Sequence, residues 1–150
     1  MADKCAIYTV AGLTINAATG NTYLIGDDGE IEGLDGMPIR RTVDNRPQTD
    51  GAILFPAFGA ARRITFEGTL LVRGIDPFGN PTAYLAAMNA LEAAMTAALD
   101  GIINADATLS WNSGADTITV RRDETPTAFR GSYPFKRFLF GLIAATPTIS

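Results

Sequence analysis

One strongly helical segment constrains this chain more than any other feature. Residues 82–99 are rich in Ala, Leu, Met and Glu, which favour helices, and Asn80-Pro81 is a typical start because Asn caps a helix and proline suits its first position. Gly101 marks the end. Apolar side chains recur at three- and four-residue steps and predict a buried stripe of Leu85, Met88, Leu91 or Met95, and Leu99. We therefore predict one helix, at about residues 81–99, packed against a sheet.

The rest of the chain carries strand signals. Residues 63–73 alternate between an apolar face, with Ile64 and Phe66, and a mostly polar face, as a half-buried strand does. The final strand, residues 135–145, is apolar on both faces, so it is either central or covered by a partner. Further strands are predicted at residues 6–10, 13–15, 22–25, 31–34, 108–111, 117–122 and 128–133. This order predicts an α+β, mainly β fold with antiparallel sheets and one flanking helix.

Residues 37–62 interrupt the strand pattern. They contain three prolines and two glycines together with an apolar run at residues 53–55. A loop of this length is uncommon inside a compact domain and is usually functional or ordered by a partner. We predict a long loop that lies on another molecule.

The residue inventory argues against catalysis. The chain has no histidine and one cysteine, Cys5, which excludes histidine-based triads, zinc sites with histidine ligands and an internal disulfide. The acidic clusters do not match a calcium loop, and Gly74 and Gly79 are not followed by the Lys of a phosphate-binding loop. We therefore predict no catalytic residue, no metal and no cofactor, and a protein that is not an enzyme.

The net charge of −4 and the pI of about 4.7 oppose specific nucleic-acid binding, which usually requires a basic face. The paired basic residues are read as solvated charges at strand ends rather than as one patch. These pairs are Arg40–Arg41, Arg62–Arg63, Arg121–Arg122 and Lys136–Arg137. The 150 residues suit a single domain, 1–150, and neither a signal peptide nor an apolar membrane span is predicted.

Two segments resemble a known family. The pattern Arg46-x-x-x-Asp50-Gly51, then Gly59 and residues 63–70 before a helix, resembles the N-terminal domain of siphophage distal tail proteins. The ending at residues 138–147 is similar to the last strand of that domain. The resemblance covers about residues 7–147, and the order of elements carries most of it.

This resemblance implies a fold, an assembly and a location. The fold would be an antiparallel β-sandwich or half-barrel with one helix, related to the tail-tube fold. Copies would join their sheets into a homo-oligomeric, hexameric ring at the distal end of a phage tail, between the tail tube protein and the hub, baseplate or tip proteins. DNA would pass through the ring without specific binding, and the protein, made in the host cytoplasm, would belong to the virion. Because the chain stops at Ser150, the resemblance implies the minimal ring-forming type, without a receptor-binding domain.

The resemblance also suggests where subunits would meet, since the long loop and the final strand would contact neighbours. The expected interface residues are Arg46, Asp50, Phe55, Phe58, Arg62, Arg63, Phe138 and Phe140. Two alternatives stay open: a major tail tube or tail-terminator ring protein within the same class, and a β-sandwich carbohydrate-binding module in a different class.

Overall fold

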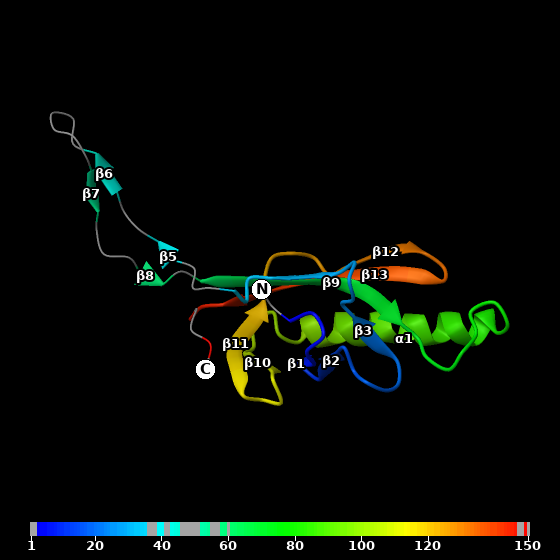
Figure 1. Ribbon diagram of the computed structural model, residues 1–150. Coiled ribbons are helices and arrows are strands. Elements are labelled where there is room, and N and C mark those ends of the chain that lie inside the picture. The colour runs from blue at the N-terminus through cyan, green and yellow to red at the C-terminus, as the bar shows by residue number, and fades with distance from the viewer. Residues whose placement is uncertain are drawn as a thin grey trace.

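A computed structural model describes residues 3–35, 39–40, 43–45, 52–54, 58–59, 61–146 and 149. For the four short ranges between 39 and 59 the description is of the backbone alone. The main body is one sheet curled into a barrel, with a single long helix beside it (Figure 1). Its elements are β1 (Tyr8–Val10), β2 (Leu13–Ile15), β3 (Thr22–Leu24), β4 (Glu30–Glu32), β9 (Arg62–Leu71), α1 (Pro81–Asp100), β10 (Ala107–Trp111), β11 (Asp116–Arg122), β12 (Ala128–Ser132) and β13 (Phe135–Ala144).

The two longest strands close the barrel. β9 and β13 pair antiparallel over eight positions, from Arg137 opposite Thr69 to Ala144 opposite Arg62. The sheet then runs in the order β13-β11-β10-β1-β2-β3-β9, which returns to its starting point after seven strands. β4 and β12 are added outside this circle, β4 beside β9 and β12 beside β13. The predicted α+β, mainly β class is confirmed, and the closed barrel is more complete than the half-barrel that was expected.

Period-2 alternation places the core inside this barrel. Ile64, Phe66, Gly68 and Leu70 of β9 are buried, whereas Thr65, Glu67 and Thr69, which alternate with them, are partly exposed. Aromatic rings meet there: Phe66 of β9 stacks on Phe140, its partner on the adjacent strand β13, and Tyr8 of β1, from across the barrel, approaches Phe66 edge-on at 5.4 Å between ring centroids. Such contacts add to the stabilisation from area burial. The final strand, β13, has neighbouring strands on both sides. It is therefore a central strand, which is one of the two alternatives predicted for residues 135–145.

The helix starts where the sequence predicted, and its buried stripe differs from the predicted one at a single residue. The Asn80 side chain accepts a hydrogen bond from the Ala83 amide at 3.3 Å, which caps the amino terminus. The buried residues of the helix are Tyr84, Met88, Met95 and Leu99. Leu85 was predicted for this stripe but is 44% exposed. Tyr84 replaces it because its ring packs against Tyr133 and its hydroxyl donates to the Pro134 carbonyl, a polar link that leucine could not make.

The predicted long loop at residues 37–62 needs correction. Four short strands lie within it: β5 (Ile39–Arg40), β6 (Val43–Asn45), β7 (Ala52–Leu54) and β8 (Phe58–Gly59). β5 pairs antiparallel with β8, and β6 with β7, so the described strands form the two ladders of one extended hairpin. We call these four strands the arm. They lie beyond the end of β9, outside the main sheet (Figure 1). The prolines and glycines obscured the strand pattern there, because each pairing is only two or three residues long.

We expect Gly68→Ala to destabilise the barrel. Gly68 lies opposite Phe138, and a Cβ there would be 2.3 Å from the Leu24 carbonyl oxygen and 2.9 Å from the Phe138 ring. Overpacking of this kind costs about 1–3 kcal/mol of unfolding free energy, measurable by urea denaturation. Gly101→Ala is the matched control, since its nearest neighbour would be at 3.4 Å and its φ is −69°. A loss in the control as large as that in Gly68→Ala would contradict this account.

Candidate functional site

The structure separates the eight expected interface residues into three groups. Phe138 and Phe140 lie inside the barrel, each 1% exposed, and stack on one another. Their expected role at a subunit interface is therefore wrong for the side chains, which belong to the core of their own chain. The sequence pattern misled because strand 135–144 is apolar on both faces, so it did not distinguish the buried face from the one that carries Leu139 and Ile143, which is only half-buried.

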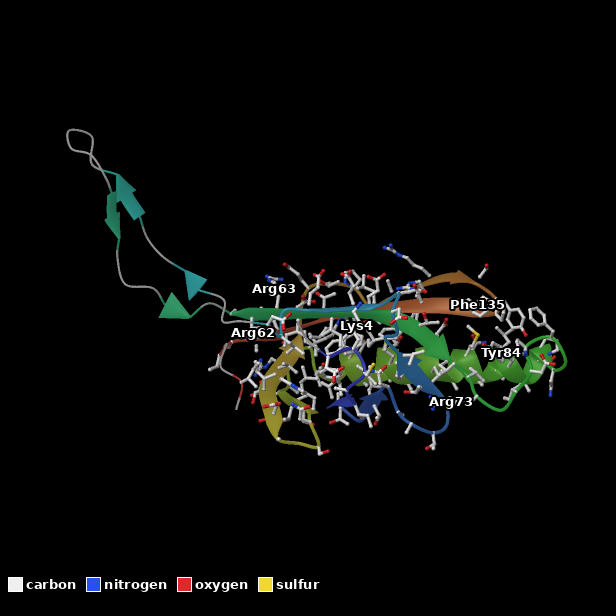
Figure 2. All side chains as sticks on the ribbon, in the orientation of Figure 1. Lys4, Arg62, Arg63, Arg73, Tyr84 and Phe135 are labelled. Atoms are coloured by element: carbon white, nitrogen blue, oxygen red, sulfur yellow. The ribbon has the colours of Figure 1, made fainter. Side chains whose placement is uncertain are left out.

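Arg62 and Arg63 point in opposite directions at the start of β9, where the strand follows the arm (Figure 2). Arg62 is 3% exposed, and its guanidinium Nη1 donates to the Gly33 carbonyl at 2.6 Å. The Arg63 side chain is 57% exposed and pairs with Glu124 at 3.1 Å. Arg62 thus stabilises the start of β9, where the chain leaves the arm; we call this point the root of the arm. Of the two arginines, only Arg63 is exposed enough to contact another molecule.

The remaining four residues belong to the arm region. Phe58 lies in β8, of which the backbone is described. Arg46, Asp50 and Phe55 lie outside the described residues. Their expected part in assembly stays a prediction.

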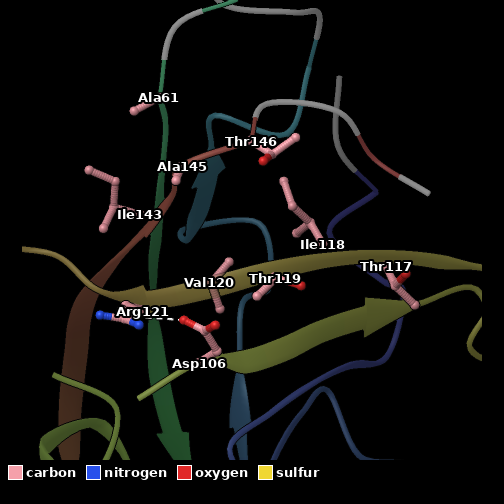
Figure 3. Close-up of a pocket in the computed structure, with 10 residues that line it drawn as sticks. All are labelled: Ala61, Asp106, Thr117, Ile118, Thr119, Val120, Arg121, Ile143, Ala145 and Thr146. Atoms are coloured by element: carbon pink, nitrogen blue, oxygen red, sulfur yellow. Dashed lines mark hydrogen bonds and ion pairs between the residues drawn. The ribbon is translucent and has the colours of Figure 1, made fainter. Parts of the chain in front are cut away.

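A groove of about 690 Å³ lies beside the root of the arm (Figure 3). Its walls come from β11 and from the adjacent ends of the β9–β13 pair: Thr119 and Arg121 of β11, Ala61 just before β9, and Ala145 just after β13. Arg121 and Asp106 form an ion pair of 2.6 Å across one side. The lining is a mixture of threonine hydroxyls and small apolar side chains. Such a surface is better suited to binding a polypeptide segment than to catalysing a reaction.

The described residues assemble no catalytic or metal-binding constellation. No group of three or more Cys, Asp or Glu residues among them could hold a metal ion. Cys5 is an exposed free thiol. Burial raises the pKa of Tyr8 and Tyr23 to about 12, so both phenols stay protonated donors at neutral pH, and Tyr23 donates to the Leu91 carbonyl at 2.5 Å. Within the described part of the chain, no helix combines the length and apolar character of a membrane span.

The paired basic residues outside the arm are largely neutralised by acidic partners. Arg121 pairs with Asp106, and Arg122 pairs with Asp100, both at 2.6 Å. Further along the chain, Lys136 contacts Glu92 at 2.5 Å, and Arg137 lies 3.5 Å from Glu67. These pairs are spread over β11 and β13 with acidic partners between them, as the sequence-based reading of separate strand-end charges expected.

The sheet has two open edges that the sequence analysis did not identify. β4, β9, β13 and β12 lie side by side as four antiparallel strands, and neither β4 nor β12 has a further partner among the described strands. The signal was present in the short pattern Glu30-Ile31-Glu32, which places one apolar residue inward between two exposed carboxylates. Open strand edges are ready-made templates for pairing with another chain.

Comparison with solved structures gives the chain a known fold. Its fold is similar to that of SPP1 Dit. The likeness to this protein, gp 19.1, has a TM-score of 0.67 and 12% sequence identity, and it covers 96% of this chain and 51% of the Dit chain. Dit is described as a paradigm of the hub adsorption apparatus in phages that infect Gram-positive bacteria. The sequence matches no protein-family model and no curated protein.

This likeness confirms, at the level of fold, the resemblance to distal tail proteins that the order of elements indicated. The chain spans about half the length of SPP1 Dit. At 12% identity the fold, rather than individual side chains, is what the two proteins share.

We expect Arg62→Met and Arg63→Met to separate the structural arginine from the exposed one. Arg62→Met keeps the aliphatic stem but removes the buried guanidinium that donates to the partly buried Gly33 carbonyl, which costs about 1–3 kcal/mol of unfolding free energy. Arg63→Met removes the exposed pair with Glu124 and a longer, 3.8 Å contact with the buried Asp123 carboxylate, which keeps its hydrogen bonds from Thr125, and should cost about 1 kcal/mol. Urea denaturation of the two variants measures the difference. Equal losses would contradict the assignment of Arg62 to the fold.

Proposed function

We propose that this chain is a structural subunit of a phage tail, forming a ring at the distal end between the tail tube and the hub, baseplate or tip proteins. The observation that carries the proposal is the fold similarity to SPP1 Dit over 96% of this chain. A hub protein acts by holding partners in place, and the described residues offer extended surfaces rather than a reaction site. The protein would be located in the tail of the virion, and its role would be structural rather than enzymatic.

The arm supports an assembly role. Each of its described strands pairs with another arm strand and not with the barrel, although β5–β8 together extend well beyond the main body. A two-stranded hairpin is marginally stable by itself in water, so an arm of this kind gains from packing on another molecule. The groove at the root of the arm, lined by threonine hydroxyls and small apolar side chains, would accommodate a segment of a neighbouring subunit.

The charge distribution supports passage of DNA without binding. The net charge is −4, and the arginines of β11 and β13 are engaged with carboxylates of the same chain. Tight binding to a phosphate backbone requires clustered, available cations. A ring of such subunits would present a surface along which DNA slides, an effect of the summed field rather than of individual contacts.

A carbohydrate-binding module is the second candidate, and one observation favours it. Phe78 and Phe135 are 78% and 71% exposed, and Tyr133, which donates a hydrogen bond to the Pro77 carbonyl, is exposed as well. Exposed aromatic rings are typical of surfaces that bind sugars or protein partners. A ring subunit accounts for the same aromatics as contacts to the proteins above or below it. Trp111, the only tryptophan, is half-buried against Tyr8 and is not offered for binding.

The first test of the ring is the solution mass of the purified protein by light scattering, with negative-stain imaging of any large species. We expect closed rings with a central hole, because the two open strand edges belong to the same sheet. Long tubes would favour a tail tube protein instead. A monomer of 15.9 kDa that binds glycans on an array would contradict the ring and favour the carbohydrate-binding module.

Shortening the arm tests its part in assembly. Arg40 and Phe58 are opposite one another in the β5–β8 pair, so an Asn-Gly turn can join them directly. We expect the barrel to fold with an unchanged melting temperature, since the arm strands lie outside the barrel sheet, while the assembled species disappears from light scattering. The full-length chain at the same concentration is the control. Rings of normal stability from the shortened chain would show that the arm is not part of the joint.

A further inference from the structure

One side of α1 faces away from the barrel core and has no charged residue along most of its length. The exposed residues opposite the buried stripe recur at three- and four-residue steps, and all are alanines: Ala86, Ala90, Ala93 and Ala97. A helix at a protein surface usually has charged and polar residues on this side. We call the side that carries these four alanines the outer side of α1.

The two charged residues of the helix are both engaged within the chain. Glu92 contacts Lys136 of β13 at 2.5 Å, and Asp100, the last residue of α1, pairs with Arg122 at 2.6 Å. The outer side of α1 therefore offers water almost no charge. The chain does not cover this side with its own described residues either, since all four alanines are exposed.

Large apolar side chains are exposed at both ends of the helix. Phe78, just before α1, is 78% exposed, and Leu85, in the second turn, is 44% exposed. Ile103, just beyond the carboxyl end, is 48% exposed. Phe78 is held in its position, because its backbone amide donates to the Asp76 carboxylate at 2.9 Å. Exposed apolar surface of this kind marks a site of association.

From these features we infer that α1 is a contact between two copies of the chain: two α1 helices pack through their outer sides in opposite directions, with Ala90 of one copy against Ala93 of the other. A twofold axis relates the copies, so Ala86 of each lies opposite Ala97 of its partner. The helix lies beside the barrel, outside the strands that form it (Figure 1). The contact thus goes beyond the proposed ring and does not depend on it, because it involves neither the arm nor a sheet edge.

Opposite directions suit both ends of the helix. The amino end of one helix, with Phe78 and Leu85, then lies beside the carboxyl end of the other, where Ile103 is exposed. The small alanines between these ends allow the helix axes to approach closely. Antiparallel helices also bring the partial negative charge of one carboxyl end to the partial positive charge of the other amino end. Parallel helices would place like partial charges side by side.

A second copy fits this face better than another kind of molecule. A contact around a twofold axis requires a surface that matches itself, and a face without free charges meets its own copy without repulsion. The net charge of −4 keeps copies apart in general, so an uncharged face is where they can meet. A nucleic acid would need available cations, which the outer side of α1 does not offer. The alanines also follow the alternating steps by which two helices pack along one another.

Disulfide mapping tests the contact in the full-length protein. Cys5, the only cysteine, is replaced by serine, and Ala86→Cys and Ala97→Cys are then made in separate chains. Mixed in equal amounts with oxidised glutathione, the two variants should form at least about tenfold more disulfide-linked dimer than either alone. In each variant alone the two thiols lie about 16 Å apart along the helix pair, beyond the reach of a disulfide. Non-reducing gel electrophoresis measures the yield.

Light scattering tests the same contact by mass. Ala90→Glu places a negative charge from each copy near the twofold axis, and Ala90 is exposed, so the barrel core is not altered. The mass of the associated species should fall about twofold, from paired chains to single chains or from paired rings to single rings. Thr108→Glu adds the same charge at an exposed position of β10 and should keep the mass of the unmodified chain. Thermal unfolding checks that every variant is folded.

Equal dimer yields from the mixture and from either cysteine variant alone would show random collision, and preferential linkage of Ala86→Cys to itself would show parallel helices. Either result, or an Ala90→Glu chain of unchanged mass, would overturn the α1 contact. Closed rings imaged with the unmodified chain would still stand in that case, because the ring uses other surfaces. Dimers linked between Ala86→Cys and Ala97→Cys without any rings would support the α1 contact and count against the ring.

Discussion

The pairing of β9 with β13 is the interaction on which the rest of the structure depends. These two strands are long enough to hold neighbours at both ends of their outer edges: β9 holds β3 and β4, and β13 holds β11 and β12. Their pairing closes the barrel and brings Phe66, Phe138 and Phe140 into one stack. Gly68 makes this possible, since it leaves room for the Phe138 ring where any side chain would collide with backbone. Weakening the pair would open the barrel and dissolve both added edges at once.

The same pair places the surfaces for which we propose a role in assembly. The chain enters β9 from the arm, and the buried Arg62 anchors this entry point through its hydrogen bond to the Gly33 carbonyl. The groove lies beside this entry, between β11 and the ends of β9 and β13. The open edges β4 and β12 flank the pair on either side. Arm, groove and edges thus all adjoin the β9–β13 pair, so a ring subunit would present them in a fixed order along one strand pair.

The structural similarity to SPP1 Dit gives these surfaces a common interpretation. A fold alone does not determine a function, so the proposal of a tail ring rests on that similarity together with features of this chain. The arm strands are paired only among themselves, and the two sheet edges have no partner within the described residues. Both features would be costly in a protein that functions as a monomer, because exposed edges invite aggregation. In a ring they are the means of assembly.

Local patterns determined much of this protein by themselves. The cap at Asn80, the alternation along residues 63–73 and the turns between short strands depend on neighbours in sequence, so the helix, nearly every strand of the barrel and the α+β class could be predicted. The absence of histidine likewise limits the chemistry that the chain can perform, whatever its fold. What decided the rest was which strand lies beside which. Sequence alternation shows that Phe138 and Phe140 share a face, but only closure of the barrel against β9 shows that this face is the core and not an interface. Only the register brings Glu30 beside Glu67 and Arg130 beside Arg137, because these pairs join residues from separate strands whose distance in sequence carries no information about their distance in space.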